Sequence, residues 1–309
     1  RVLKANPLSI PARLGLAAGL LKKQKLNEAI AEFRPLAHLP QVRLQLARLL
    51  ITRNLQLPEL AREWSEIEKL LEQAKEQRDD PVNEVLLRAE MLAARGQLDA
   101  ARRVIEEARV TQTDRIEFLI ASSRMAERAG ETRQANLAMG QALSLAGDAT
   151  RAEPLLRQAW EKDRSDFPAA LALLQHFVRH KQLEAATTMF RQLDEKQGLR
   201  QRPHELAQCH VALGQDEPAI GVYRRVLEAQ PNDSAALRAL AELHLRRQQL
   251  DVAAPLLSRL LDAQATLPPS EVRWARRQLA VVWAGRGQRH QALALLDRNQ
   301  QDGSAIVDD

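Results

Sequence analysis

The stretch Gly214-Gln-Asp-Glu-Pro-Ala219-Ile-Gly-Val-Tyr223, followed by Pro231-Asn-Asp, decides the fold of this chain. A glycine opens it, a small residue follows five positions later, and a large residue comes four positions after that. Glycine readily takes the left-handed conformation that ends a helix, and a small side chain lets two helices cross closely. The stretch therefore predicts the turn and the second helix of an antiparallel helix pair.

The same spacing recurs along the chain and defines a repeat. Its turn and small residues are Gln24 and Ala29, Gly96 and Ala101, Gly147 and Ala152, Lys181 and Ala186, Gln248 and Ala253, and Gly287 and Ala292. From Ala152 to Ala292, successive small residues, Ala219 included, are separated by 34, 33, 34 and 39 positions. Another small residue precedes each turn by seven positions, at Ala17, Ala89, Gly140, Ala207, Ala241 and Ala280, with Leu174 as the exception. A period of about 34 residues predicts an array of helix pairs.

This pattern resembles the tetratricopeptide repeat family, and the resemblance is strongest from Asp166 to Gln300. It implies an all-α fold, a right-handed superhelical solenoid of antiparallel helix pairs. We expect about eight repeats in one solenoid over residues 1–309, with a tail at 301–309. The sequence departs from the family early in the first helix of each pair, where Leu, Ala or Arg mostly replaces a large aromatic residue.

Two intervals break the period. Between Ala101 and Ala152 there is room for one extra helix, so we predict helices at 114–129, 131–146 and 149–162 and a kink in this region. Between Ala29 and Ala101 we predict a further pair, with Ala61 in the small position. Its second helix would have Pro58 and Trp64 in its first turns and would end near Lys75.

Polar residues mark several expected helix starts. Ser165-Asp166 precedes Phe167, Asn232-Asp233-Ser234 precedes the next first helix, and Ser270 follows Pro268-Pro269. Ser, Asp and Asn accept hydrogen bonds from the unpaired amides of a first helical turn.

Composition narrows the class of protein further. Apolar residues make up 45%, charged residues 28% and aromatic residues 3%, which favours a folded helical chain. No apolar run approaches the roughly 20 residues of a membrane span. The only cysteine, Cys209, excludes an intrachain disulfide and leaves both the cytoplasm and the bacterial periplasm open. The first residues, Arg1 to Pro7, resemble the end of a helix, so we expect an excerpt of a larger protein.

The sequence contains none of the familiar catalytic or cofactor motifs, so we predict no enzyme, no cofactor and no metal site. His176 and His180 are four residues apart on one helix, but no third ligand accompanies them, and we interpret them as a solvated face. His210 and His244 are 34 residues apart in equivalent positions. They are interpreted as packing residues, and a pH-sensitive contact is the alternative.

The first helices of the pairs should line a concave groove, and its residues are the candidate site. We predict that a partner contacts Gln175, Arg179, His204, Gln208, Arg238, Glu242, Arg246, Trp274 and Arg277. Trp274 beside arginines is typical of an interface anchor, although it could equally cap the end of the array. The groove becomes basic toward the C-terminus, which favours a partner with acidic segments. The Lys and Asn pattern with which this family clamps a terminal carboxylate is not met.

The predicted function is a non-enzymatic scaffold that binds a protein or peptide in the concave groove. Two alternatives remain open: a helical-repeat RNA-binding protein, and a regulatory arm of a larger enzyme or of a bacterial envelope assembly or export complex. The near balance of 45 basic against 40 acidic residues counts against nucleic acid. End-to-end association of uncapped terminal helices is a further expectation.

Overall fold

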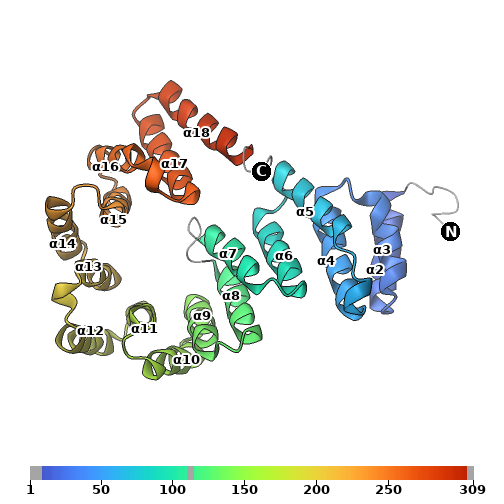
Figure 1. Cartoon of the computed structure of the whole chain (residues 1–309), viewed down its shortest axis with the longest axis horizontal. Helices are drawn as coiled ribbons and strands as arrows, with labels where there is room; N and C mark the ends of the chain where they lie inside the picture. The colour runs from blue at the N-terminus through green and yellow to red at the C-terminus, as the bar shows by residue number, and fades with distance from the viewer. Residues whose placement is uncertain (1–8, 110–114, 305–309) are drawn as a thin grey trace. The chain divides into compact units, whose positions relative to one another are not determined.

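The computed structural model describes residues 9–109 and 115–304, which form seventeen α-helices and four short 3-10 helices with no strand among them. Figure 1 shows their order along the chain. The first seven α-helices are α2 (Ile10–Lys22), α3 (Leu26–Phe33), α4 (Pro40–Gln56), α5 (Ser65–Gln77), α6 (Pro81–Ala94), α7 (Leu98–Arg109) and α8 (Ile116–Arg128). The next four are α9 (Thr132–Leu145), α10 (Ala149–Lys162), α11 (Phe167–Arg179) and α12 (Leu183–Gln197). The last six are α13 (Pro203–Ala212), α14 (Asp216–Ala229), α15 (Ser234–Arg246), α16 (Leu250–Asp262), α17 (Pro269–Gly285) and α18 (Arg289–Ser304).

Sixteen of these helices form eight contacting pairs, from α2 with α3 to α17 with α18, and α8 is the extra helix. The predicted helices at 114–129, 131–146 and 149–162 correspond to α8, α9 and α10. The expectation of an all-α array of about eight helix pairs with one additional helix is therefore confirmed.

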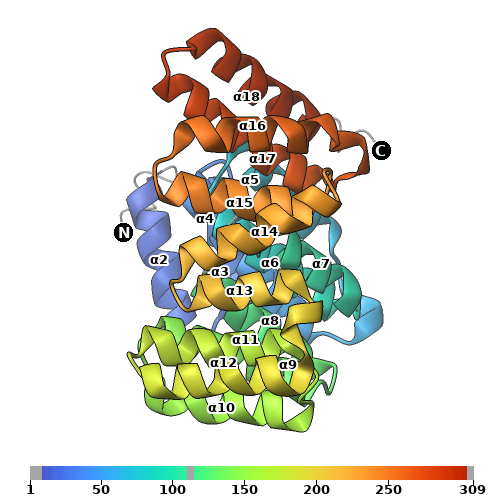
Figure 2. The same ribbon diagram turned by 90° about the vertical axis from the view of Figure 1, so that its left-hand side faces the viewer.

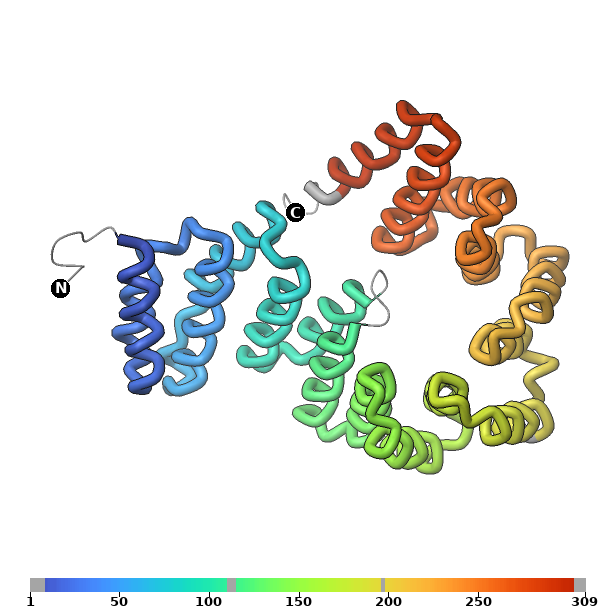
Figure 3. Tube along the Cα trace, turned by 180° about the vertical axis from the view of Figure 1, so that it is seen from behind, coloured from blue at the N-terminus to red at the C-terminus, as the bar shows by residue number. Residues whose placement is uncertain are grey.

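The chain divides into two compact units. Unit 1 takes residues up to Arg109 together with Arg124–Glu131, and unit 2 takes Val110–Ser123 together with everything from Thr132 onward. The helices α2, α3 and α4 of unit 1 run side by side in Figure 3. In unit 2 the pairs succeed one another from α10 to α18 in Figure 2, and α11, α13, α15 and α17 lie on the inner side of this row in Figure 1.

The turn residues take the left-handed conformation that the sequence predicts. Gly214 has a φ of 71°, and Lys181 and Gln248 reach 60° and 58° at equivalent turns. After each of these three turns, the amide of the next residue bonds back to a carbonyl of the first helix, as from Gln249 to His244 at 2.9 Å. This bond satisfies a carbonyl that would otherwise be unpaired at the helix end.

The small positions are where helices approach closely. Ala207, Ala219 and Ala241 are fully buried. At Gly140 a β-carbon would lie 2.7 Å from Cγ of Leu156, so α9 and α10 pack too closely there for any side chain.

The helix starts agree with two of the three predicted caps. Asp166 accepts a hydrogen bond from the amide of Ala169 at 3.2 Å, and Asp233 accepts one from Ala236 at 2.8 Å. Ser270 is not a cap, because α17 begins one residue earlier, at Pro269, whose ring already supplies the helical φ.

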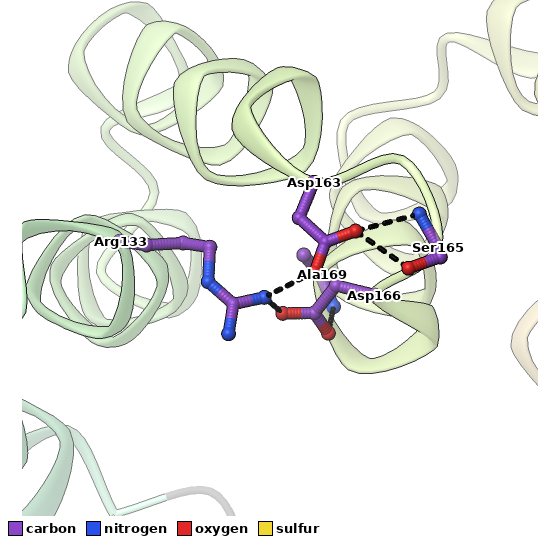
Figure 4. Close-up of polar contacts among 5 residues, drawn as sticks. All are labelled: Arg133, Asp163, Ser165, Asp166 and Ala169. Atoms are coloured by element: carbon purple, nitrogen blue, oxygen red, sulfur yellow. Dashed lines mark hydrogen bonds and ion pairs between the residues drawn. The ribbon is translucent and has the colours of Figure 1, made fainter.

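Asp166, which caps α11, also links the α9–α10 pair to the α11–α12 pair through Arg133. Figure 4 shows Arg133 of α9 reaching both Asp163 and Asp166, with an Nη1 to Oδ2 distance of 3.4 Å to Asp163. Asp163 accepts two hydrogen bonds from Ser165, one from its hydroxyl at 2.6 Å and one from its amide at 3.0 Å. These bonds, helped by Arg133, lower the pKa of Asp163.

Two other expectations need correction. Ala61 does not occupy a small position in an α-helix, because it lies in the 3-10 helix Glu59–Ala61, which ends at the extended Arg62, and the next α-helix begins only at Ser65. The amide group of Asn54 donates to the carbonyl of Glu63 at 2.6 Å and holds the connection in place. At the other end, α18 extends to Ser304, into the predicted tail, of which 305–309 lie outside the described residues.

Candidate functional site

The first helices of four successive pairs in unit 2 enclose a groove of about 410 Å³. We call it the α11–α17 groove. Its lining residues are Leu171, Gln175, His204, Gln208, Val211, Tyr223, Ala235, Arg238, Ala239, Glu242, Leu243, Arg246 and Glu271. Aliphatic side chains thus lie beside amide and charged groups along one surface.

Arg238 on α15 is the central charged group of this groove. Its Nε donates to Oε1 of Glu242 at 2.9 Å, and its Nη1 lies 3.7 Å from Oε1 of Glu271 on α17. The guanidinium carbon lies 4.5 Å from the ring centre of Trp274. A cation over an indole face is stabilised by the ring quadrupole, so Arg238 is held in one orientation.

His204 and Tyr223 form the wall next to Arg238. Nε2 of His204 donates to Oδ2 of Asp233 at 3.1 Å, and Asp233 also caps α15. Tyr223 is almost fully buried. Burial, followed by the charges of Glu242 and Asp233, raises the pKa of its phenol to about 12, so the hydroxyl keeps its proton at neutral pH.

Two exposed amides occupy equivalent positions on successive inner helices. Gln175 on α11 and Gln208 on α13 each follow a fully buried residue, Leu174 and Ala207. An amide side chain offers both a donor and an acceptor, which matches the main chain of an extended peptide. The repeat spacing therefore places two such groups along the same groove.

Six of the nine predicted site residues line the groove: Gln175, His204, Gln208, Arg238, Glu242 and Arg246. The other three do not. Arg179 is exposed and donates to Oγ of Ser144 at 3.4 Å, and Arg277 is exposed on α17 outside the lining. Trp274 is only 7% exposed, so it is not a surface anchor; it lies beneath Arg238 in the core formed by α15 to α18.

The sequence reasoning missed Tyr223 and Glu271 as lining residues. Tyr223 belongs to the second helix of its pair, α14, whereas the prediction considered first helices alone. Glu271 lies 33 residues after Arg238, close to one repeat period, and this spacing is the signal that could have revealed their contact.

The arginines of the groove already have acidic partners. Arg238 has Glu242 and Glu271, and Nη2 of Arg246 donates to Oδ1 of Asp216 at 3.1 Å. The predicted basic groove is therefore largely neutralised by the protein itself.

The other histidines considered as candidates make side-chain contacts within unit 2. His176 is fully buried and its Nδ1 lies 2.9 Å from Oγ of Ser144, so it is not on a solvated face. Burial, with repulsion from His180, lowers the pKa of His176. His210 and His244 make matching contacts to Gln215 and Gln249, at 2.8 and 2.7 Å.

Cys209 is fully buried, and burial raises the pKa of its thiol to about 12. Within residues 9–109 and 115–304 there is no cluster of three or more His, Cys, Asp or Glu side chains placed to hold a metal ion. Nor does any helix in the described part of the chain have the length and apolarity to cross a membrane.

The fold is that of a helical-repeat protein, and the first helices of successive pairs line a groove. Residues 204–243, which span α13 to most of α15 and include the centre of the groove, match the family model described as tetratricopeptide repeat. The described part of the chain is thus an array of helix pairs, of which residues 204–243 are similar to the tetratricopeptide repeat. No curated protein matches the sequence.

Solved structures that are similar to the chain include the following three. A chain of the APC/C hetero-tetramer Cut9–Hcn1 is 14% identical with a TM-score of 0.33; the match covers 89% of this chain and 56% of that one. YrrB, a TPR protein with an unusual peptide-binding site, is 21% identical with a TM-score of 0.30, covering 58% and 90%. The human IFIT1 dimer with PPP-AAAA is 14% identical with a TM-score of 0.41, covering 95% and 77%.

Proposed function

We propose that the protein is a non-enzymatic interaction scaffold whose α11–α17 groove binds an extended segment of a partner protein. The observation that carries the proposal is the alignment of Gln175, Gln208 and Glu242 on three successive inner helices, beside an aliphatic floor that includes Leu171 and Val211. A bound segment would place its main chain on the amides and its apolar side chains on the floor.

Rigidity of the groove supports this function. Arg238 is held by Glu242, Glu271 and Trp274, and His204 is held by Asp233. A surface whose polar side chains are already ordered loses less conformational entropy on binding, and it therefore binds a flexible segment more tightly.

The test is selection of short random peptides displayed on phage against the full chain. Ala235 is exposed on the first turn of α15 and lines the groove, so Ala235→Trp fills it without replacing a core residue. Ala294, exposed on α18, gives the matched control Ala294→Trp. At least one class of the selected peptides should lose binding to Ala235→Trp and keep it with Ala294→Trp. Equal binding of every selected class to both variants would exclude the groove as a binding site.

A further inference from the structure

A second pocket, of about 400 Å³, lies in unit 2 where η3 (Leu199–Gln201) and the start of α13 meet α14. We call it the Arg225 pocket. It is lined by Arg200, Pro203, His204, Leu206, Val222, Arg225, Val226, Ala229 and Gln230. Only His204 is shared with the α11–α17 groove, so the two sites have largely separate walls.

The walls of the Arg225 pocket are aliphatic. Val222 and Val226 are one turn apart on α14 and line the pocket together with Leu206 of α13. Both valines are more than nine-tenths buried, so they form a fixed wall rather than a flexible rim. A slot of this kind accepts a branched aliphatic side chain, because burial of apolar surface is its main source of binding energy.

The rim of the pocket is basic. Arg225 is exposed on α14, and Arg200, whose side chain is 85% exposed, lies 3.5 Å from Asp194 outside the pocket. Of the lining residues that the structure describes, none is Asp or Glu. This distinguishes the pocket from the α11–α17 groove, where Glu242 and Glu271 offset the charge of the arginines.

We propose that the Arg225 pocket is a second docking site, which takes an acidic peptide segment that inserts an aliphatic side chain between Val222, Val226 and Leu206. Carboxylates flanking the inserted side chain would pair with Arg225 and Arg200 on the rim. The acidic partner predicted for the inner groove fits this pocket because Arg225 has no ion pair with a described Asp or Glu, whereas Arg200 already lies 3.5 Å from Asp194. Single-stranded RNA fits less well, because the described lining has no Phe, Tyr or Trp and offers His204 as its one aromatic ring for stacking.

The experiment compares two adjacent arginines of α14. Arg224 and Arg225 are both exposed, and reversal of either changes the net charge equally, but only Arg225 lines the pocket. Phage-displayed random peptides are selected on the full chain, and the enriched peptides are assayed by fluorescence anisotropy against wild type, Arg224→Glu and Arg225→Glu. Thermal melting by circular dichroism confirms that both variants are folded.

The proposal expects one enriched class with Asp or Glu beside Leu, Ile or Val. Its affinity should fall roughly fivefold or more in Arg225→Glu, and far less in Arg224→Glu. Ala229→Trp, which fills the mouth of the slot, should abolish its binding, whereas Ala235→Trp in the inner groove should leave it intact.

Three outcomes of the peptide assays would overturn the proposal: no acidic class is enriched, the two arginine variants lose affinity equally, or Ala235→Trp alone abolishes peptide binding. The last outcome would assign the peptides to the α11–α17 groove. It would contradict the proposal for the Arg225 pocket while supporting the proposed function, so the two can fail independently. A labelled oligouridylate is the probe for RNA, and tighter binding of it than of the peptides, lost in Arg225→Glu, would also overturn the proposal.

Discussion

The substitution Gly140→Ala tests whether α9 and α10 can pack closely only with a small residue at their crossing. An added β-carbon would lie 2.7 Å from Cγ and 2.8 Å from Cδ2 of Leu156, and 3.3 Å from the carbonyl oxygen of Ala152. Leu156 is fully buried and cannot swing into solvent. The carbonyl belongs to the backbone of α10, so relief of the clash requires the two helices to move apart.

Two opposing terms set the magnitude. Replacement of glycine by alanine inside a helix favours the helix by about 1 kcal/mol. Overpacking of a well-filled core costs about 1–3 kcal/mol. The net change is a loss of up to about 2 kcal/mol in the free energy of unfolding. The matched control is Gly221→Ala in α14, where a β-carbon meets no atom within 4 Å and the helix term acts alone.

Urea unfolding followed by circular dichroism compares the two variants, and hydrogen exchange of the α9 and α10 amides localises the effect. We expect lower protection in these helices for Gly140→Ala and an unchanged or higher midpoint for Gly221→Ala. Leu156→Ala should cost less in the Gly140→Ala background than in wild type, because the new methyl group occupies vacated space. If Gly140→Ala is as stable as Gly221→Ala, then α9 and α10 do not approach each other closely enough at Gly140 to exclude a β-carbon.

Three further predictions concern single side chains. Lys181→Gly and Gln248→Gly should each stabilise the protein by roughly 1 kcal/mol, because both residues have a left-handed φ that costs a side chain energy; lower urea midpoints would contradict this. Burial lowers the pKa of His176 from its ordinary value of 6.5, so the unfolded chain binds a proton more readily than the folded chain. The free energy of unfolding should therefore fall as the pH drops through about 6.5. The same pH dependence of the urea midpoint in His176→Gln would refute this. Cys209, with its thiol pKa raised to about 12, should react with a disulfide reagent at pH 8 only as fast as the protein opens, and rapid native reaction would show an accessible thiolate.

The order of the helices could be predicted because local geometry repeats in the sequence. A left-handed turn favours Gly, and a close crossing requires a small side chain, so Gly147 and Ala152 place α9, its turn and α10 without any knowledge of the rest. The misplaced helix shows the limit of this reasoning. Ala61 has the right size for a small position, but it lies in the short 3-10 helix Glu59–Ala61, and the extended Arg62 separates this turn from α5.

The inner surface could be predicted in part, for the same reason. Gln175, Gln208 and Glu242 occupy one repeated position on successive first helices, so the repeat period is enough to place them in one groove. The repeat period does not predict whether a large side chain such as Trp274 is buried. Trp274 lies under Arg238 because α17 ends the row of inner helices in contact with α15, and nothing in its local sequence distinguishes it from an exposed indole.

The net charge of a surface depends on ion pairs between neighbouring repeats. The residues on one face of a helix do not reveal these ion pairs. Arg238 pairs with Glu271 across 33 residues, and Arg246 pairs with Asp216 across 30. Arginines counted on an inner face are thus offset by acids that belong to neighbouring helices. Arg225 lines a pocket with no described carboxylate, although its own helix begins with Asp216 and Glu217. An acidic ligand should therefore be sought where the lining lacks carboxylates rather than where arginines are most frequent.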